Sequence, residues 1–72
     1  MGILEAFGDR VRQFRNARGM SQQELADKTG LHRNYVGKVE KGEKNISLLN
    51  MCKIAAELRV DLADLIKDVE LK

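Results

Sequence analysis

The sequence predicts a single all-α domain of five short helices. Three observations support this prediction. Proline is absent from the 72 residues, no segment sustains the strict alternation of apolar and polar residues that marks a β-strand, and apolar side chains recur at helical spacing. Residues that start or stop helices, chiefly Ser, Asp and Gly, lie between the apolar stretches. The connections are short, so we expect one domain over residues 1–72.

The first helix is expected near the N-terminus. Its apolar face consists of residues that step by one, three, four and three positions, namely Ile3, Leu4, Phe7, Val11 and Phe14. Gly8 interrupts this helix and should weaken it by about 1 kcal/mol relative to alanine. Gly19 adopts a left-handed conformation at low cost, so the helix should end there. Four arginines lie largely off the apolar face: Arg10, Arg12, Arg15 and Arg18.

A capping box marks the start of the second helix. In the segment SQQE, the Ser21 hydroxyl can accept a hydrogen bond from the Glu24 backbone N–H, and the Glu24 carboxylate can reach back. Leu25 and Ala26 should then face inward. The Thr-Gly pair at residues 29–30 should end this helix after about two turns.

The third helix is expected over about residues 32–41, with Gly42 after its last turn. Val36 and Val39 mark the side that should be buried. The opposite side is basic, carries one amide side chain and has a glycine near its middle. It contains Arg33, Asn34, Gly37 and Lys38.

Two further helices should complete the domain. Ser47 is a good N-cap for a fourth helix after a loop at residues 43–46. Its inward face is expected to contain Leu48, Met51 or Cys52, Ala55 and Leu58. Asp61 should cap a fifth helix, and Asp64 places negative charge where the helix dipole favours it. The apolar side of the fifth helix consists of Leu62, Leu65, Ile66 and Val69.

Basic charge is concentrated in the first part of the chain. The net charge is +2, but residues 1–45 contain nine Lys and Arg against six Asp and Glu, whereas residues 46–72 contain four against five. The basic part is therefore the candidate for binding a polyanion. We find no membrane span and no signal peptide, and the single cysteine excludes an internal disulfide. We therefore expect a cytoplasmic protein in a reducing compartment.

Residues 21–42 form the unit most relevant to function. A short helix, a glycine turn and a second short helix can cross steeply, near the geometry of a helix-turn-helix. In such a motif the first helix lies across the sugar-phosphate backbone and the second enters the major groove of DNA. The two-helix pattern is not specific by itself, because many all-α proteins contain a helix, a glycine and a helix.

A longer run of sequence resembles a known family. Its marks are SQQELA at residues 21–26, the Thr-Gly turn, VEKGEKNIS at residues 39–47 and KIAAEL at residues 53–58. This run, within about residues 5–66, is similar to the Cro/C1-type (Xre-like) helix-turn-helix regulators. The resemblance implies a compact five-helix, lambda-repressor-like DNA-binding domain. The segment GLHRNYVGKVEKGEKNISLLN resembles the controller proteins of restriction–modification systems, and phage Cro/C1-like repressors and antitoxins are the alternatives.

The resemblance implies a role for each polar residue of the motif. Arg33 and Asn34 would read base edges, since Arg pairs bidentately with guanine and Asn with adenine. Gly37 would let the recognition helix lie close to the groove floor, and Lys38 would reach a base or a phosphate. Expected backbone contacts, which position the protein without reading sequence, involve Gln22, Gln23, Tyr35, Lys41, Lys44 and Asn45.

Four other residues are given structural roles. Arg15 and Glu40 match an ion pair that bridges the first and third helices in related domains, and a carboxylate that faced phosphate would repel it. His32 is expected to be a weak helix cap. Cys52 has no Cys or His partner at ligand spacing, so we expect a buried small hydrophobe. We therefore expect no metal, no cofactor, no catalytic site and no enzyme activity.

The C-terminal half contains more apolar side chains than one small core needs. They are Ile46, Leu49, Ile54, Leu62, Ile66, Val69 and Leu71. A slightly apolar surface is one explanation. We expect instead a homodimer formed by residues 46–72, with Ile46, Leu49, Leu62, Ile66 and Val69 at its interface. Its recognition helices would lie about one DNA turn, 34–36 Å, apart on a roughly palindromic operator.

These expectations together describe a homodimeric regulator of transcription. The motif occupies the whole chain, so we expect no small-molecule effector, and control would follow from protein concentration and operator occupancy. The controller-protein resemblance implies activation at low occupancy and repression at high occupancy, of its own gene and the endonuclease gene. A protein-binding module of the antitoxin type, with DNA binding secondary, is the competing hypothesis, although the chain has almost no tail to fold on a partner.

Overall fold

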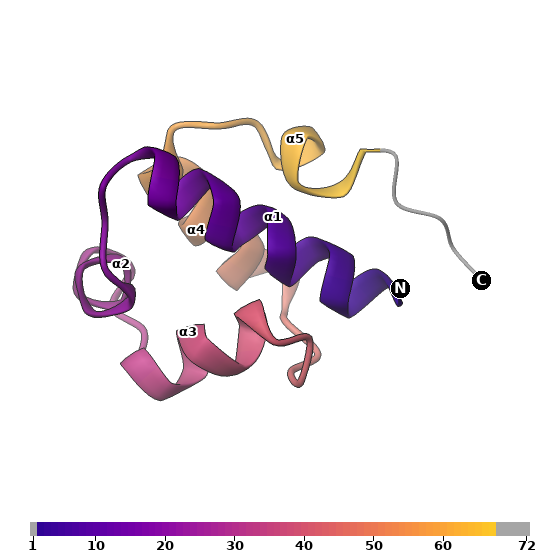
Figure 1. Ribbon diagram of the computed structural model, residues 1–72, viewed down its shortest axis with the longest axis horizontal. Helices are drawn as coiled ribbons and strands as arrows, with labels where there is room; N and C mark the ends of the chain where they lie inside the picture. Colours follow the sequence, from indigo (N-terminus) through magenta and orange to yellow (C-terminus); the bar gives the residue numbers. More distant parts are fainter. Residues whose placement is uncertain (1, 68–72) are drawn as a thin grey trace.

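Five helices make up the part of the chain that the structure describes, residues 2–67, and no strand occurs there. In this computed structural model they are α1 (Ile3–Ala17), α2 (Gln22–Thr29), α3 (Arg33–Glu40), α4 (Leu48–Leu58) and α5 (Leu62–Ile66). Helix α1 runs through the middle of the molecule and contacts α3, α4 and α5, whereas α2 contacts α3 and α4 (Figure 1). The all-α prediction is confirmed.

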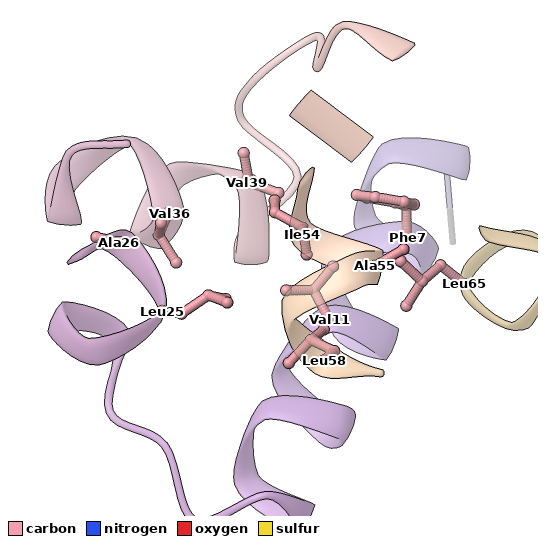
Figure 2. Close-up of a cluster of buried hydrophobic side chains, with 10 residues drawn as sticks. All are labelled: Phe7, Val11, Leu25, Ala26, Val36, Val39, Ile54, Ala55, Leu58 and Leu65. Carbon is pink, nitrogen blue, oxygen red and sulfur yellow. The ribbon is translucent and has the colours of Figure 1, made fainter. Parts of the chain in front are cut away.

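Every helix contributes to one hydrophobic core. Figure 2 shows the ten buried side chains meeting between the helices: Phe7, Val11, Leu25, Ala26, Val36, Val39, Ile54, Ala55, Leu58 and Leu65. Each position follows from helical spacing within its own element. Because Leu25, Val36 and Val39 all enter this core, the motif at residues 21–42 is held as part of the domain and not as an appended arm.

The four residues predicted to start helices, Ser21, His32, Ser47 and Asp61, all occupy N-cap positions. The Ser21 hydroxyl accepts a hydrogen bond from the Glu24 backbone N–H at 3.0 Å, and the Glu24 carboxylate accepts one from the Ser21 N–H at 3.0 Å. The Ser47 hydroxyl caps α4, and the Asp64 carboxylate accepts a hydrogen bond from the Asp61 backbone N–H at the start of α5. His32 occupies the cap position of α3 without a side-chain hydrogen bond, as suits a weak cap.

The expected inward face of α4 is partly wrong. Leu48 is 63% exposed and Cys52 is exposed, whereas Ile54, which we had assigned to the surplus apolar residues, is fully buried. Residues 48–58 contain apolar side chains on two faces, and periodicity cannot choose between them. Packing against α1 and α2 selects the face with Ile54, Ala55 and Leu58.

Gly8 has a role opposite to the weakening that we expected. A Cβ at this position would lie 2.7 Å from the Glu40 carbonyl oxygen and would also strike the Val39 carbonyl oxygen. Gly8 therefore allows the backbone of α1 to touch the C-terminal end of α3. A close approach of this kind depends on a partner 31 or more residues away, so local helix propensity does not predict it.

Two of the N-terminal arginines bind carbonyl groups of the C-terminal helices. The Arg18 guanidinium donates hydrogen bonds to the Leu58 carbonyl at 2.7 Å and to the Arg59 carbonyl at 3.3 Å. The Arg10 guanidinium donates to the Asp64 carbonyl at 2.9 Å. Terminal carbonyls of a helix lack intrahelical partners, so these arginines act as side-chain caps. Part of the basic excess of residues 1–45 therefore serves the fold.

Arg59 terminates α4 in a left-handed conformation, with φ of 59°, which favours glycine. We expect Arg59→Gly to raise the free energy of unfolding by about 0.5–1 kcal/mol, because glycine removes this strain while keeping the carbonyl that Arg18 binds. Urea unfolding followed by circular dichroism measures the change. Arg59→Ala keeps the strain and serves as control, and equal stability of the two variants would contradict the explanation.

Candidate nucleic-acid interface

Helix α3 is buried on one side and open on the other. Val36 and Val39 are in the core, with exposed fractions of 0% and 2%. Arg33, Asn34 and Lys38 lie on the opposite side, and all three are exposed. The amphipathic spacing read from the sequence therefore leaves a polar ridge, defined here as Arg33, Asn34 and Lys38, pointing away from the domain.

Two hollows border the polar ridge. The first, called the outer hollow, lies toward α2 and the loop after α3 and is lined by Gln23, Asp27, Leu31, His32, Arg33, Asn34, Tyr35, Lys38 and Lys44. The second, called the inner hollow, is lined by Gln22, Arg33, Asn34, Gly37, Lys38, Lys41 and Glu43. The structure thus brings together all predicted DNA-contacting residues except Asn45, which is exposed but lines neither hollow.

The cations of this face are available to a polyanion. Within residues 2–67, no ion pair involves Arg33, Lys38, Lys41 or Lys44; the pairs found there join Arg12 to Asp9, Arg15 to Glu40 and Lys67 to Asp64. A cation without an internal partner does not have to break a bond before it binds phosphate. The face can therefore bind a DNA backbone by charge.

Arg15 and Glu40 form a buried network beneath the inner hollow. The guanidinium donates two hydrogen bonds to the carboxylate, at 2.6 and 3.0 Å, and a third to the Met20 carbonyl at 2.8 Å. The Gln22 amide nitrogen donates to the same carboxylate at 3.1 Å. The Glu40 carboxylate therefore points into the domain, and one of the two Gln22 amide protons remains available.

Gly37 and Gln22 are neighbours across the inner hollow. A Cβ built on Gly37 would lie 3.6 Å from the Gln22 side-chain oxygen, which is an ordinary van der Waals contact. The fold therefore does not require glycine at this position. An interior helix glycine that packing does not demand is a functional candidate, since a bare backbone allows close approach of a ligand.

Two polar residues of the outer hollow already have partners. The Gln23 amide donates to the Asp27 carboxylate at 2.8 Å. The Tyr35 hydroxyl oxygen accepts a hydrogen bond from the Asn50 amide nitrogen of α4 at 3.1 Å. Sequence reasoning missed Asp27, Glu43 and Asn50. Asp27 lies four residues after Gln23 on α2, a spacing that signals contact, whereas nothing in the sequence links Asn50 to Tyr35.

The residues expected at a dimer interface divide into three groups. Leu49 and Ile66 are 66% and 44% exposed, as an interface requires. Ile46 and Leu62 are only partly exposed, because they pack against the core. Val69 lies outside the described residues. Leu48, which we had expected to be inward, is 63% exposed beside Leu49 and extends the apolar start of α4.

Among residues 2–67, no group of three or more His, Cys, Asp or Glu side chains is placed to hold a metal ion. No helix in that range is long and apolar enough to cross a bilayer.

Comparison with known proteins identifies relatives of this chain. A helix-turn-helix family model, HTH_3, matches residues 11–65. The control protein C.SmaI of Serratia marcescens is 38% identical over 72 residues, which are all of this chain and 86% of that protein.

Solved structures match the fold as well. The crystal structure of the restriction-modification controller protein C.AhdI from Aeromonas hydrophila superposes with a TM-score of 0.84 and 47% identity, covering 86% of this chain and 94% of that one. SinR, a master regulator for biofilm formation solved in complex with DNA, superposes with a TM-score of 0.81 and 32% identity over 85% of this chain and 98% of that one.

Proposed function

This chain belongs to the helix-turn-helix family HTH_3 of DNA-binding transcription regulators, and we propose that it is a restriction–modification controller protein that binds a palindromic operator as a homodimer. The family is one of regulators, so the chain is not an enzyme. Two surfaces support the finer proposal. One is the polar side of α3, and the other is the apolar start of α4 with the outer side of α5.

The observation that carries the DNA-binding proposal is the polar ridge itself. Arg33 and Asn34 stand exposed in the first turn of α3, where they can reach base edges. Arg is the usual partner of guanine O6 and N7, and Asn is that of adenine N6 and N7. Gly37, one turn later, adds no side chain between the helix and the groove floor. We assign base reading to Arg33 and Asn34 and close approach to Gly37.

Contacts to the DNA backbone would surround the ridge. Gln22 begins α2, where free backbone N–H groups and the helix dipole favour an anion, and its remaining amide proton can be donated to a phosphate oxygen. Lys38, Lys41 and Lys44 add positive charge along the two hollows, and Gln23, Tyr35 and Asn45 add neutral polar groups. These groups position the domain without reading sequence.

The division between base reading and backbone contact gives a direct test. Operators should first be selected by the wild-type protein from a random duplex pool, and we expect the selected sequence upstream of its own gene. Arg33→Ala should lower the affinity for this operator by about 1–3 kcal/mol for each half-site and relax the preference at one base pair of each. Gln22→Ala should weaken binding to operator and random duplex alike. Titrations by fluorescence anisotropy measure both, and the same loss for both variants on every duplex would contradict the assignment.

We place the dimer interface at the apolar side chains that the core leaves exposed. Leu48 and Leu49 at the start of α4 and Ile66 on α5 are all exposed, with Ile66 the least so at 44%. A core in a domain of this size supplies only about 3–5 kcal/mol, and the single cysteine of the chain cannot form an internal disulfide. Association through these side chains would add stability and would present two recognition helices to two half-sites.

Replacing a central side chain of this interface should separate the protomers. We expect Leu49→Asp to sediment as a monomer at micromolar concentration, with an unchanged circular dichroism spectrum because Leu49 lies outside the core. Its operator affinity should fall at least about 100-fold through lost avidity. Ile3→Asp is the matched control, since Ile3 is an exposed apolar residue on α1, outside the interface. A Leu49→Asp dimer would rule out this location.

A further inference from the structure

A single side-chain hydrogen bond joins the recognition helix α3 to α4 within residues 2–67. The Asn50 amide nitrogen donates to the Tyr35 hydroxyl oxygen at 3.1 Å, across 15 positions of sequence. Tyr35 is partly buried with its ring against the core, and Asn50 is partly buried as well. The backbone N–H of Asn50 is in turn bound by the Ser47 hydroxyl at 3.1 Å, which anchors the residue in the first turn of α4.

The Tyr35 hydroxyl and the Asn50 amide nitrogen differ in the hydrogen bonds that they can make. A phenol has one proton to donate and lone pairs that accept, whereas an amide nitrogen only donates. The Tyr35 oxygen therefore uses one of its lone pairs to accept the hydrogen bond from Asn50, and the phenolic proton remains for another acceptor. A hydroxyl that accepts one hydrogen bond is also polarised to donate a stronger one. Asn50 thus leaves the Tyr35 hydroxyl able to donate its proton to an acceptor outside the domain.

The surroundings of Tyr35 indicate the kind of acceptor. Tyr35 lines the outer hollow together with Arg33, Lys38 and Lys44. The one carboxylate there, Asp27, already accepts a hydrogen bond from the Gln23 amide, so an anionic oxygen from outside the protein is the acceptor that this hollow favours. We propose that Asn50 is a positioning residue: by donating to the Tyr35 oxygen, it directs the phenolic proton to a phosphate oxygen of the DNA backbone. This inference rests on the proposed function, because it requires that α3 lie in the groove of a duplex.

A double-mutant cycle on the full chain tests the inference. Six proteins would be titrated against one duplex, the operator selected by the wild type. They are the wild type, the single variants Tyr35→Phe, Asn50→Ala and Asn50→Asp, and the double variants that combine Tyr35→Phe with Asn50→Ala or with Asn50→Asp. Melting curves establish that each variant is folded. The salt dependence of binding is measured for each, with Lys44→Ala as the charged reference from the same hollow.

We expect Tyr35→Phe to weaken binding about tenfold for each half-site, as the loss of a hydrogen bond to a charged group does. Asn50→Ala should weaken binding severalfold in the wild-type background and have no further effect in the Tyr35→Phe background. Asn50→Asp should weaken it more than alanine does, because its carboxylate accepts the phenolic proton, and most of this excess should vanish when Tyr35→Phe is also present. The salt slope should fall by about 0.9 per half-site in Lys44→Ala and stay unchanged in Tyr35→Phe and Asn50→Ala.

Three results would overturn the inference. Additive losses from Tyr35→Phe and Asn50→Ala would show that Asn50 does not act through Tyr35. Wild-type affinity of Tyr35→Phe would show that the hydroxyl binds no phosphate. In both cases the operator binding of the wild type still stands, so the proposed function survives. If the wild type selects no operator from the pool, the proposed function fails and the inference fails with it.

Discussion

Gly8→Ala should strongly destabilise the domain, although alanine is the better helix former. The new methyl group would meet the carbonyl oxygens of Val39 and Glu40, which belong to backbone and cannot rotate away. Overpacking of this kind costs up to about 3 kcal/mol, most of the 3–5 kcal/mol that a core of this size supplies. In thermal unfolding followed by circular dichroism, we expect Tm to fall by more than roughly 10 °C.

Gly37→Ala is the matched control for this experiment. Gly37 is also inside a helix, but its added Cβ meets only the Gln22 side chain, at 3.6 Å. This variant should gain up to about 1 kcal/mol from helix propensity. If both variants melt at or above the wild-type temperature, α1 and α3 are not in the close contact that the structure describes.

Glu40→Ala should destabilise the domain at least as much as Gly8→Ala does, for an electrostatic reason. Its carboxylate is the buried partner of Arg15, and both side chains are at most 10% exposed. Removing one member of a buried ion pair leaves the other charge without compensation and costs about 3–5 kcal/mol. The Gln22 amide would lose its acceptor as well. We expect far-UV circular dichroism at about 25 °C to show a protein that is mainly unfolded.

Two further variants separate burial from charge. Arg15→Met combined with Glu40→Leu removes both charges and fills similar volume, so it should restore folding to within about 2 kcal/mol of wild type. Asp9→Ala breaks the Arg12–Asp9 pair, which lies at the surface, and should cost no more than about 1 kcal/mol. Normal stability of Glu40→Ala, or failure of the double replacement to fold, would argue against a buried pair in this place.

The two predictions concern the same end of the recognition helix. Gly8 contacts the last carbonyls of α3, and the side chain of Glu40, its last residue, is bound by Arg15. The opposite, N-terminal end of α3 presents Arg33 and Asn34 to solvent. The helix is thus held to α1 at one end while its other end is exposed, as the proposed DNA contact requires. Rigid support of this kind would keep the proposed base-reading side chains in a fixed position.

Most of the fold could be predicted from local sequence. The capping box at Ser21 and Glu24, the left-handed glycine at position 30 and the serine cap of α4 are interactions between residues at most four apart. The buried faces of α2 and α3 follow from helical spacing for the same reason. The polar ridge of α3 was predictable because it is what remains when Val36 and Val39 are buried.

By itself the sequence determined five helices, the residues that start them and the polar ridge on the third, because hydrogen bonding and amphipathicity act within a few residues. It placed Val69 on the fifth helix, which the structure ends at Ile66. Tertiary structure decided that Ile54 enters the core while Cys52 does not, that Gly8 is required, and that Arg10 and Arg18 cap distant helices. It also decided that Asn50 binds Tyr35. Each of these facts depends on atoms 15 or more residues apart, and such contacts exist only once the helices have packed.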